Sequence, residues 1–242
     1  MAHDKTAAST EPLLTSVLDE LGRDIISGRL ETGQTFTLQS IGERFQISRT
    51  VAREAMRALE QLGLVSSSRR VGITVLPRQR WSVFNPTVIT WRLQTESERA
   101  RQLNSLTELR VAVEPIAAYN AATAATPEQR AELKELATTM RELGEHTHGA
   151  TQDFLEADMR FHSLLLEASG NEMFAMLAPS LMRALYGRTE FGLQPETPAS
   201  EALDAHEELA QAIARGEAQA AESAARALIG EVRTALVPNQ SA

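Results

Sequence analysis

The sequence predicts a mainly α-helical protein, with an N-terminal winged helix-turn-helix domain and a C-terminal all-α helical bundle. Three observations support this fold class. Up to about residue 77 the pattern is helix, short helix, turn, helix and β-hairpin, which is the winged helix-turn-helix order. From about residue 99 onward, alanine and leucine recur at helical spacing between capping residues. Arginine is concentrated in the hairpin and in the helix before it.

The composition is that of an intracellular globular protein. The chain has 242 residues, which suits two domains, and it has no cysteine, which excludes disulfide frameworks, thiolate zinc sites and cysteine nucleophiles. Residues 1–12 lack the apolar core of a signal peptide. No apolar run reaches the roughly 20 residues that cross a bilayer. We therefore expect a cytoplasmic protein with no membrane partner.

Positive charge is concentrated in one segment of an acidic chain. The net charge is −8, but residues 41–80 contain eight arginines and three acidic residues, a local charge of +5. The remainder holds the other 16 of the 24 basic residues and 29 of the 32 acidic residues, a charge of −13. This contrast is typical of a nucleic-acid-binding module joined to a second domain. A solvated arginine face would give the same pattern.

The first elements follow from apolar spacing. Residues 1–12 are polar and are predicted to form a disordered tail. Apolar residues recur at helical spacing from Leu13 until Gly28 stops the run, which predicts a helix. A short helix over 38–45 and a tight turn at 46–47 follow.

The next helix is expected to contact DNA. Ser48 suits an N-cap, and Arg49 and Arg53 lie on the face away from the apolar positions. Such a helix fits the major groove, where arginines in its first turn reach guanine edges and phosphates. Two β-rich runs then flank a basic, serine-rich tip over 66–70, which predicts a wing that contacts the DNA backbone or minor groove. The DNA-binding domain therefore spans 13–77.

A connector and a bundle complete the chain. Residues 78–98 are too apolar for a free linker and are predicted to contain a short docking helix. The residues expected to pack on a neighbouring domain are Trp81, Phe84, Val88 and Trp91. Residues 99–236 are expected to form an effector-binding and dimerisation domain, and 237–242 a tail. Its predicted helices span 99–123, 127–143, 151–169, 172–190, 199–215 and 217–236.

Three ionisable residues of the bundle have the composition of a metal site. Asp158 and His162 are four residues apart and share one face of an otherwise apolar helix, and His206 lies among apolar residues on a later helix. Two imidazoles and a carboxylate form a 2-His-1-carboxylate site with open positions. A satisfied pair in the core or on the surface would show the same spacing.

The N-terminal part resembles the DNA-binding domain of GntR-type bacterial transcription regulators. The resemblance covers residues 38–75 and is clearest in the stretch SRTVAREA at 48–55. It implies operator contacts from the arginine after the serine and from the arginine four residues later. Gln39 stands where many members have a third contacting arginine. The DNA-binding residues expected on these grounds are Gln39, Ser48, Arg49, Thr50, Arg53, Arg69 and Arg70.

The C-terminal part resembles the all-helical effector domain of the FadR subfamily. The matching motifs are ELRVAVEP at 108–115, DMRFH at 158–162 and HEELAQAI at 206–213. The resemblance implies a divalent metal of the zinc, nickel or manganese class on Asp158, His162 and His206. Leu228 stands about where many members have a further histidine ligand, which implies either a weaker site or one that effector and water complete.

Arg110 is a candidate for binding an effector. It lies among apolar residues of the first long helix, where a guanidinium needs an anionic partner. Glu114 and Asp158 would provide a structural salt bridge, whereas the resemblance implies that the arginine binds an effector carboxylate. The expected effector site is Arg110, Asp158, His162 and His206. The connector over 81–91 also resembles that of the branch that senses sugar acids such as galactonate or gluconate.

The expected function is a dimeric, ligand-responsive transcription regulator. Two copies would bind double-stranded operator DNA, as a repressor of a carbohydrate or organic-acid catabolic operon, and a carboxylate metabolite would alter the affinity. One alternative is a metal-dependent hydrolase or oxygenase fused to a DNA-binding domain, although no convincing general base or nucleophile accompanies the metal ligands. Another is an architectural DNA binder, against which the polar residues of the core argue. The expectation is therefore a regulator that is not an enzyme.

Overall fold

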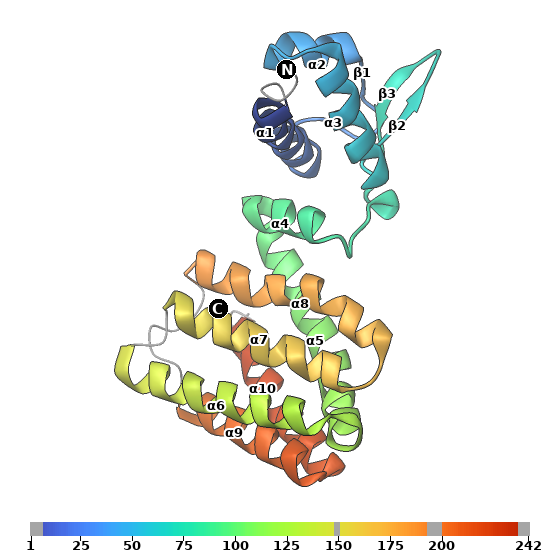
Figure 1. Cartoon of the computed structure of the whole chain (residues 1–242). Coiled ribbons are helices and arrows are strands. Elements are labelled where there is room, and N and C mark those ends of the chain that lie inside the picture. Colours follow the sequence, from blue (N-terminus) through green and yellow to red (C-terminus); the bar gives the residue numbers. More distant parts are fainter. Residues whose placement is uncertain (1–6, 148–150, 193–199, 237–242) are drawn as a thin grey trace, which may run out of the picture. The chain divides into compact units, whose positions relative to one another are not determined.

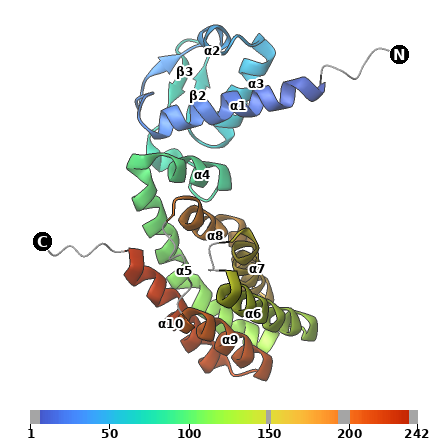
Figure 2. The same ribbon diagram turned by 90° about the vertical axis from the view of Figure 1, so that its left-hand side faces the viewer.

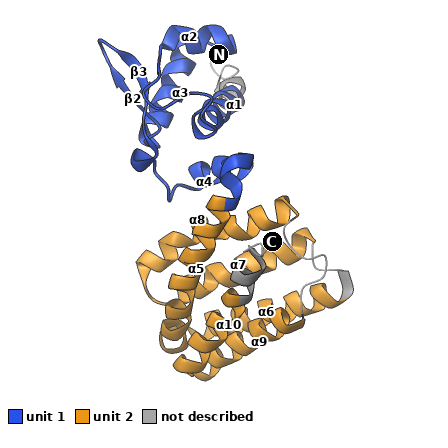
Figure 3. Ribbon diagram, turned by 180° about the vertical axis from the view of Figure 1, so that it is seen from behind, with its two compact units in different colours: residues 1–100 blue, residues 101–242 orange. Residues whose placement is uncertain are grey.

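The chain divides into two compact units, residues 1–100 and 101–242 (Figure 3). The structure is a computed structural model, and it describes residues 7–147, 151–192 and 200–236. Each unit has its own buried apolar core.

The N-terminal unit has the predicted winged helix-turn-helix fold (Figure 1). Its first helices are α1 (Ala7–Ile26), α2 (Leu38–Phe45) and α3 (Arg49–Gln61). The strands are β1 (Thr35–Phe36), β2 (Val65–Ser68) and β3 (Gly72–Val75), which form an antiparallel sheet in the order β1-β3-β2. The hairpin of β2 and β3 is the wing, and Val65 pairs with Val75 at its base.

Local capping explains the turn between α2 and α3. Gln46 ends α2 with a φ of 53°, the left-handed conformation that closes many helices. Ser48 then caps α3, because its side chain accepts a hydrogen bond from the backbone N–H of Val51. The predicted turn and N-cap are thus confirmed.

The core of the N-terminal unit lies between helices and wing. The inner face of α1 packs on α3 (Figure 2), and β2 and β3 contribute the valines at the base of the wing. The central residues of this core, all less than 4% exposed, are Val17, Leu21, Ile41, Ala52, Ala55, Leu59, Leu64 and Ile73. The apolar face of α3 is therefore buried, and its arginine face is left outward.

Two expectations for the N-terminal unit were wrong. First, α1 begins at Ala7, so part of the expected 1–12 tail is helical, with Pro12 inside the helix. Residues 1–6 lie outside the described residues. Second, Ser66 and Ser68 belong to β2, not to the wing tip, because they pair with Thr74 and Gly72 of β3.

The connector docks on the N-terminal unit. It forms a short 3₁₀ helix η1 (Arg78–Arg80) and α4 (Pro86–Gln94). Trp81, Val88 and Trp91 join the same core, as expected. The indole Nε1 of Trp91 donates a 2.8 Å hydrogen bond to Asp19 of α1. The expectation for Phe84 was wrong: it is 58% exposed, because it precedes α4 and lies off its buried face.

The second unit is formed by helices alone in its described residues, as predicted. These are α5 (Glu96–Ala124), which begins in the first unit, α6 (Pro127–Thr147), α7 (Gln152–Ala168), α8 (Glu172–Glu190), α9 (Ser200–Arg215) and α10 (Ala218–Leu236). The bounds agree with the sequence analysis to within a few residues. The largest difference is in α6, which was expected to end at residue 143 but continues through Gly144 to Thr147. Residues 237–242 lie outside the described residues.

Helix α7 is central to this unit. One of its faces packs on α6 and α9 through Phe161, Leu164 and Leu165, and another packs on α5 and α8 through Leu155 and Leu166. Figure 1 shows α7 between α6 and α8. A polar side chain on the inner side of α7 is therefore buried whichever neighbour it faces. No described helix combines the length and apolar character that a bilayer crossing requires.

Candidate functional site

The exposed face of α3 presents the arginines that the sequence singled out. Arg49, Thr50 and Arg53 are exposed, whereas Val51 and Ala52 between them are buried. Ser48 and Gln39 are also exposed. The first turn of α3 therefore exposes its basic side chains and could enter the major groove of DNA.

Salt bridges divide the basic segment into two groups of arginines. Arg44 lies 2.5 Å from Glu20 and 2.6 Å from Asp24, both in α1, and Arg78 pairs with Glu98. These arginines hold the unit together and are neutralised. The others form no salt bridge with any residue that the structure describes, so their charge is available to phosphates; they are Arg49, Arg53, Arg57, Arg69, Arg70 and Arg80.

The wing is attached to α3 by one carboxylate. Glu60, near the end of α3, accepts hydrogen bonds from the backbone N–H and the hydroxyl of Ser67 in β2, at 2.9 and 3.0 Å. The tip, with Arg69 and Arg70, follows β2 and is exposed. The direction of the wing is therefore fixed relative to the recognition helix.

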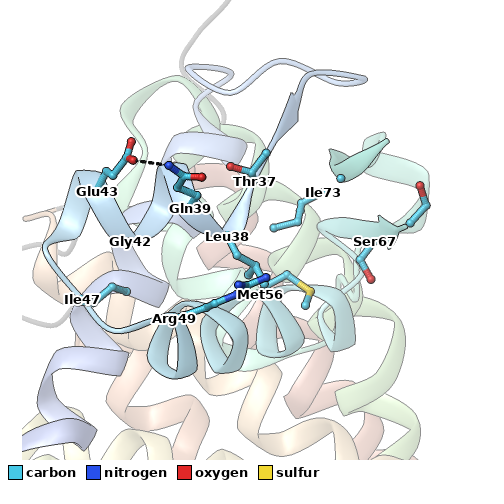
Figure 4. Close-up of a pocket in the computed structure, with 12 residues that line it drawn as sticks. Thr37, Leu38, Gln39, Gly42, Glu43, Ile47, Arg49, Met56, Ser67 and Ile73 are labelled. Carbon is cyan, nitrogen blue, oxygen red and sulfur yellow. Dashed lines mark hydrogen bonds between the residues drawn. The ribbon is translucent and has the colours of Figure 1, made fainter. Parts of the chain in front are cut away.

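A pocket of about 680 Å³ opens between α2, α3 and the wing (Figure 4). Gln39 donates a 2.8 Å hydrogen bond to Glu43 at its edge, so the amide is oriented by its own helix. The sequence predicts separate contacts from α2, α3 and the wing, whereas the structure brings these elements to one concave surface. The lining side chains are those of Thr37, Leu38, Gln39, Glu43, Ile47, Arg49, Met56, Ser67, Ser68 and Ile73.

A buried polar cluster lies in the second unit. Asp158 and His162 of α7 and His206 of α9 are 7%, 2% and 6% exposed, and one ligand atom from each lies within 4.8 Å of the others. The sequence could group the first two by their spacing, but only the packing of α7 and α9 brings in His206. Glu114 of α5, which the sequence analysis considered only as a partner of Arg110, completes the cluster.

The position of α9 is held by α6. Arg141 of α6 lies 2.8 Å from Glu207, the residue after His206, and also pairs with Asp204. Arg130 of α6 donates to the carbonyl of Ile213 near the end of α9, and to that of Ala122 in α5 at 2.8 Å. These contacts fix the register in which α9 presents His206 to α7.

Hydrogen bonds direct one ring nitrogen of each histidine toward Asp158. In His206, Nδ1 lies 2.6 Å from the carbonyl oxygen of Ala202, so this nitrogen carries the proton and Nε2 has the lone pair. In His162, Nδ1 lies 2.7 Å from Glu114 Oε2, although its alignment falls short of a regular hydrogen bond. An acceptor on Nδ1 is the arrangement that orients metal-binding imidazoles.

The three side chains fit a divalent metal ion. The Nε2 atoms of His162 and His206 lie 3.3 and 3.4 Å from Oδ1 of Asp158. Ligands of one zinc ion at about 2.1 Å in a tetrahedral arrangement lie about 3.4 Å apart. The buried Nε2 of His206 has no hydrogen-bond partner among the described residues. A buried nitrogen normally has such a partner, so its lone pair is available to bind a metal ion.

Arg110 is joined to this cluster through Glu114. Its Nε lies 2.5 Å from Oε1 of Glu114, and its Nη2 donates to Oε2 at 3.3 Å. Burial alone would raise the pKa of Glu114, but the charges of Arg110 and His162 outweigh it and lower that pKa to about 2. Burial acts likewise on Asp158, and the neighbouring imidazoles of His162 and His206 hold its pKa well below the usual range.

Two positions complete the description of the cluster. Arg188 of α8, which the sequence analysis did not single out, is 7% exposed, and its buried Nε has no hydrogen-bond partner among the described residues. The burial of Arg188 could have been predicted from its spacing from Leu181 and Leu185, since helical periodicity places all three on the inner face of α8. Leu228 is 3% exposed and packs in the apolar core that contains Phe161.

Comparison with protein families accounts for both units. The family described as "Bacterial regulatory proteins, gntR family" matches residues 13–75, and the FCD domain matches residues 105–231. The chain belongs to the GntR family, with an FCD domain. This GntR regulator is a DNA-binding transcription regulator, and its helix-turn-helix and helical units correspond to the two matched regions.

Curated relatives and a solved structure agree with this assignment. The HTH-type transcriptional regulator YieP of Escherichia coli is 30% identical over 92% of this chain and 94% of its own length. The galactonate operon transcriptional repressor of the same organism is 30% identical over 86% of this chain and 90% of its own. The structure of Lar, which controls the Listeria monocytogenes agr system, shares the fold at 16% identity, with a TM-score of 0.59 over 96% of this chain and 97% of that one.

Proposed function

We propose that this GntR regulator represses a carbohydrate or organic-acid catabolic operon in the cytoplasm and that a carboxylate metabolite bound in its helical unit alters its affinity for the operator. The observation that carries the proposal is the coexistence of two sites in one chain. One is a set of exposed arginines on α3 and the wing that form no salt bridge with the described residues, and the other is a buried cluster of Asp158, His162 and His206.

DNA binding is assigned to the first turn of α3 and to the wing. Arg49 and Arg53 are the base-contacting residues, and Thr50 and Ser48 flank them at the helix start. Arg69 and Arg70 at the wing tip, and Gln39 at the start of α2, contact the backbone or the minor groove. Two copies of the chain bind a two-fold-symmetric operator as a homodimer.

Effector binding is assigned to the buried cluster. Asp158, His162 and His206 would hold a divalent metal of the zinc, nickel or manganese class, which would supply a Lewis-acidic centre for a carboxylate and a neighbouring hydroxyl. Arg110 belongs to the same site, where two of its five guanidinium donors are bound by Glu114. A sugar acid is the favoured class, because the 30% identical relative from E. coli is a galactonate operon repressor.

The test measures operator binding and its response to acids. Fluorescence anisotropy with DNA from upstream of the protein's own gene should show binding in the nanomolar range that weakens with rising salt. Added galactonate or gluconate, in the presence of zinc, should shift that affinity at least severalfold. Failure to bind any of this DNA more tightly than a shuffled fragment would refute the regulatory role.

An enzymatic role is the second candidate, because two histidines and one carboxylate leave coordination positions open for a reaction. Nuclear magnetic resonance of galactonate incubated with the zinc-loaded protein separates the two functions. A regulator leaves the acid unchanged while its affinity for DNA shifts, whereas an enzyme consumes it.

A further inference from the structure

The cations of the buried cluster differ in how they are neutralised. Arg110 has a carboxylate of its own, since Glu114 receives hydrogen bonds from its Nε and Nη2. Asp158 is occupied by the imidazoles of His162 and His206. Arg188 has no carboxylate within salt-bridge distance among the described residues.

Because Arg188 is buried, the lack of a carboxylate partner destabilises the fold. Helix α8 packs along α7, and Leu181 and Leu185, two turns and one turn before Arg188, lie in the apolar core that α5, α7 and α8 share. Arg188 follows them on the same face and is 93% buried, so solvent offers little compensation. A buried, unpaired guanidinium destabilises a fold, and proteins retain one where it serves a ligand.

The electrostatic environment of Arg188 includes charged groups of the buried cluster. Burial and the like charge of Arg110 lower the pKa of Arg188, while the carboxylate of Asp158 raises it. Arg188 comes from α8, Asp158 from α7 and Arg110 from α5, and these three helices share one apolar core.

We propose that Arg188 binds the acid group of the effector directly and that Arg110 acts as a positioning residue, which orients His162 through Glu114. This inference rests on the proposed function, because it names the residue that recognises the acid in the same site. A fork of parallel N–H donors suits a carboxylate, and the affinity for the acid follows from pairing a buried charge that has no salt-bridge partner among the described residues.

The experiment uses the full-length protein loaded with zinc. Isothermal titration calorimetry compares galactonate with galactitol, which has the same hydroxylated carbon chain but no carboxylate. The variants are Arg188→Met, which keeps length without charge, and Arg188→Lys, which keeps charge without the fork. Arg183→Met is the matched control, because Arg183 lies on the same helix, half-buried, with its guanidinium 5.7 Å from the ring of Tyr186.

The expected result has three parts. Wild-type protein and Arg183→Met bind galactonate at least tenfold more tightly than galactitol. Arg188→Met loses that difference and binds zinc as the wild type does, and Arg188→Lys retains part of it. The melting temperature of ligand-free Arg188→Met equals or exceeds that of the wild type, because the variant removes an unpaired buried charge.

Three outcomes overturn the inference. They are a wild type that does not distinguish the acid from the alcohol, an Arg188→Met variant that still distinguishes them, and a ligand-free Arg188→Met variant that melts well below the wild type, which would show a structural partner. Operator binding, measured separately, keeps the proposed function distinct. A chain that binds its operator without distinguishing galactonate from galactitol retains the regulatory role and loses this assignment.

Discussion

Glu60 and Ser67 connect the recognition helix to the wing. A single carboxylate oxygen at the end of α3 accepts both the N–H and the hydroxyl of a serine in β2. The arginines of α3 and those of the wing tip are thereby held in a fixed relative position before any DNA is present. Such preorganisation lowers the entropic cost of binding.

Removing the serine hydroxyl tests this connection. Ser67→Ala should lower operator affinity by a factor of about five, since a net hydrogen bond contributes about 1 kcal/mol. Amide exchange in β2 should accelerate. Ser66→Ala is the matched control, because Ser66 is exposed on the same strand and pairs through its backbone with Thr74. Equal affinities for the two variants would mean that Glu60 does not set the wing direction.

Arginines in the first turn of α3 should dominate operator binding. Arg49→Ala and Arg53→Ala should each weaken binding by about 1–3 kcal/mol per half-site, and the effect doubles in a dimer. Anisotropy at fixed salt provides the measurement. Arg101→Ala removes the same charge from an exposed position on α5 and should leave affinity nearly unchanged. If all three variants behave alike, the basic face contributes only a diffuse charge.

Glu114 should make the metal-free protein sensitive to acid. Its pKa is about 2 in the folded chain against 4.5 ordinarily, so the stabilisation is complete above pH 4.5 and is lost as the pH falls toward 2. A shift of this size corresponds to about 3 kcal/mol. Urea unfolding across this range should show the loss, and Glu114→Gln should flatten the slope. An unchanged slope in the variant would assign the acid sensitivity to other carboxyl groups.

Leu228→His should strengthen metal binding. The residue lies in α10, where the family resemblance places a further histidine, and the proposed site has three ligands among the described residues. A fourth imidazole would close the coordination sphere, as in structural zinc sites. Competition with a chelator should then show at least tenfold tighter zinc binding. His206→Ala should abolish binding, and Glu208→Gln, an exposed change on the same helix, should not. If neither Leu228→His nor His206→Ala changes the zinc affinity, the metal binds elsewhere.

What could be predicted from sequence was mostly local. Ser48 caps α3 through a bond that spans three residues, and the i,i+4 spacing of Asp158 and His162 guarantees a common face. Helix bounds followed from the same short-range signals. Strand β1 was missed because two residues carry no periodic pattern.

The remaining features depend on how helices pack. Glu114 was predicted as a partner of Arg110, but its contact with His162 exists only because α5 and α7 meet. Arg188 belongs to no motif, and a single arginine in a helix is usually exposed, so its burial follows from the contact of α8 with α7. Phe84 shows the reverse error, since an apolar residue before a helix was assumed to be buried.

The packing of α4 on α1 determines where the DNA-binding domain can be replaced by that of another regulator. A Cβ on Gly22 would lie 2.5 Å from ring atoms of Trp91, so α4 sits directly on the backbone of α1. A chimera joined after residue 77 would separate Trp91 from Gly22 and from Asp19, its hydrogen-bond acceptor. A junction after Gln94 keeps them together. The recombination boundary between modules therefore lies beyond α4, and not at the end of the wing.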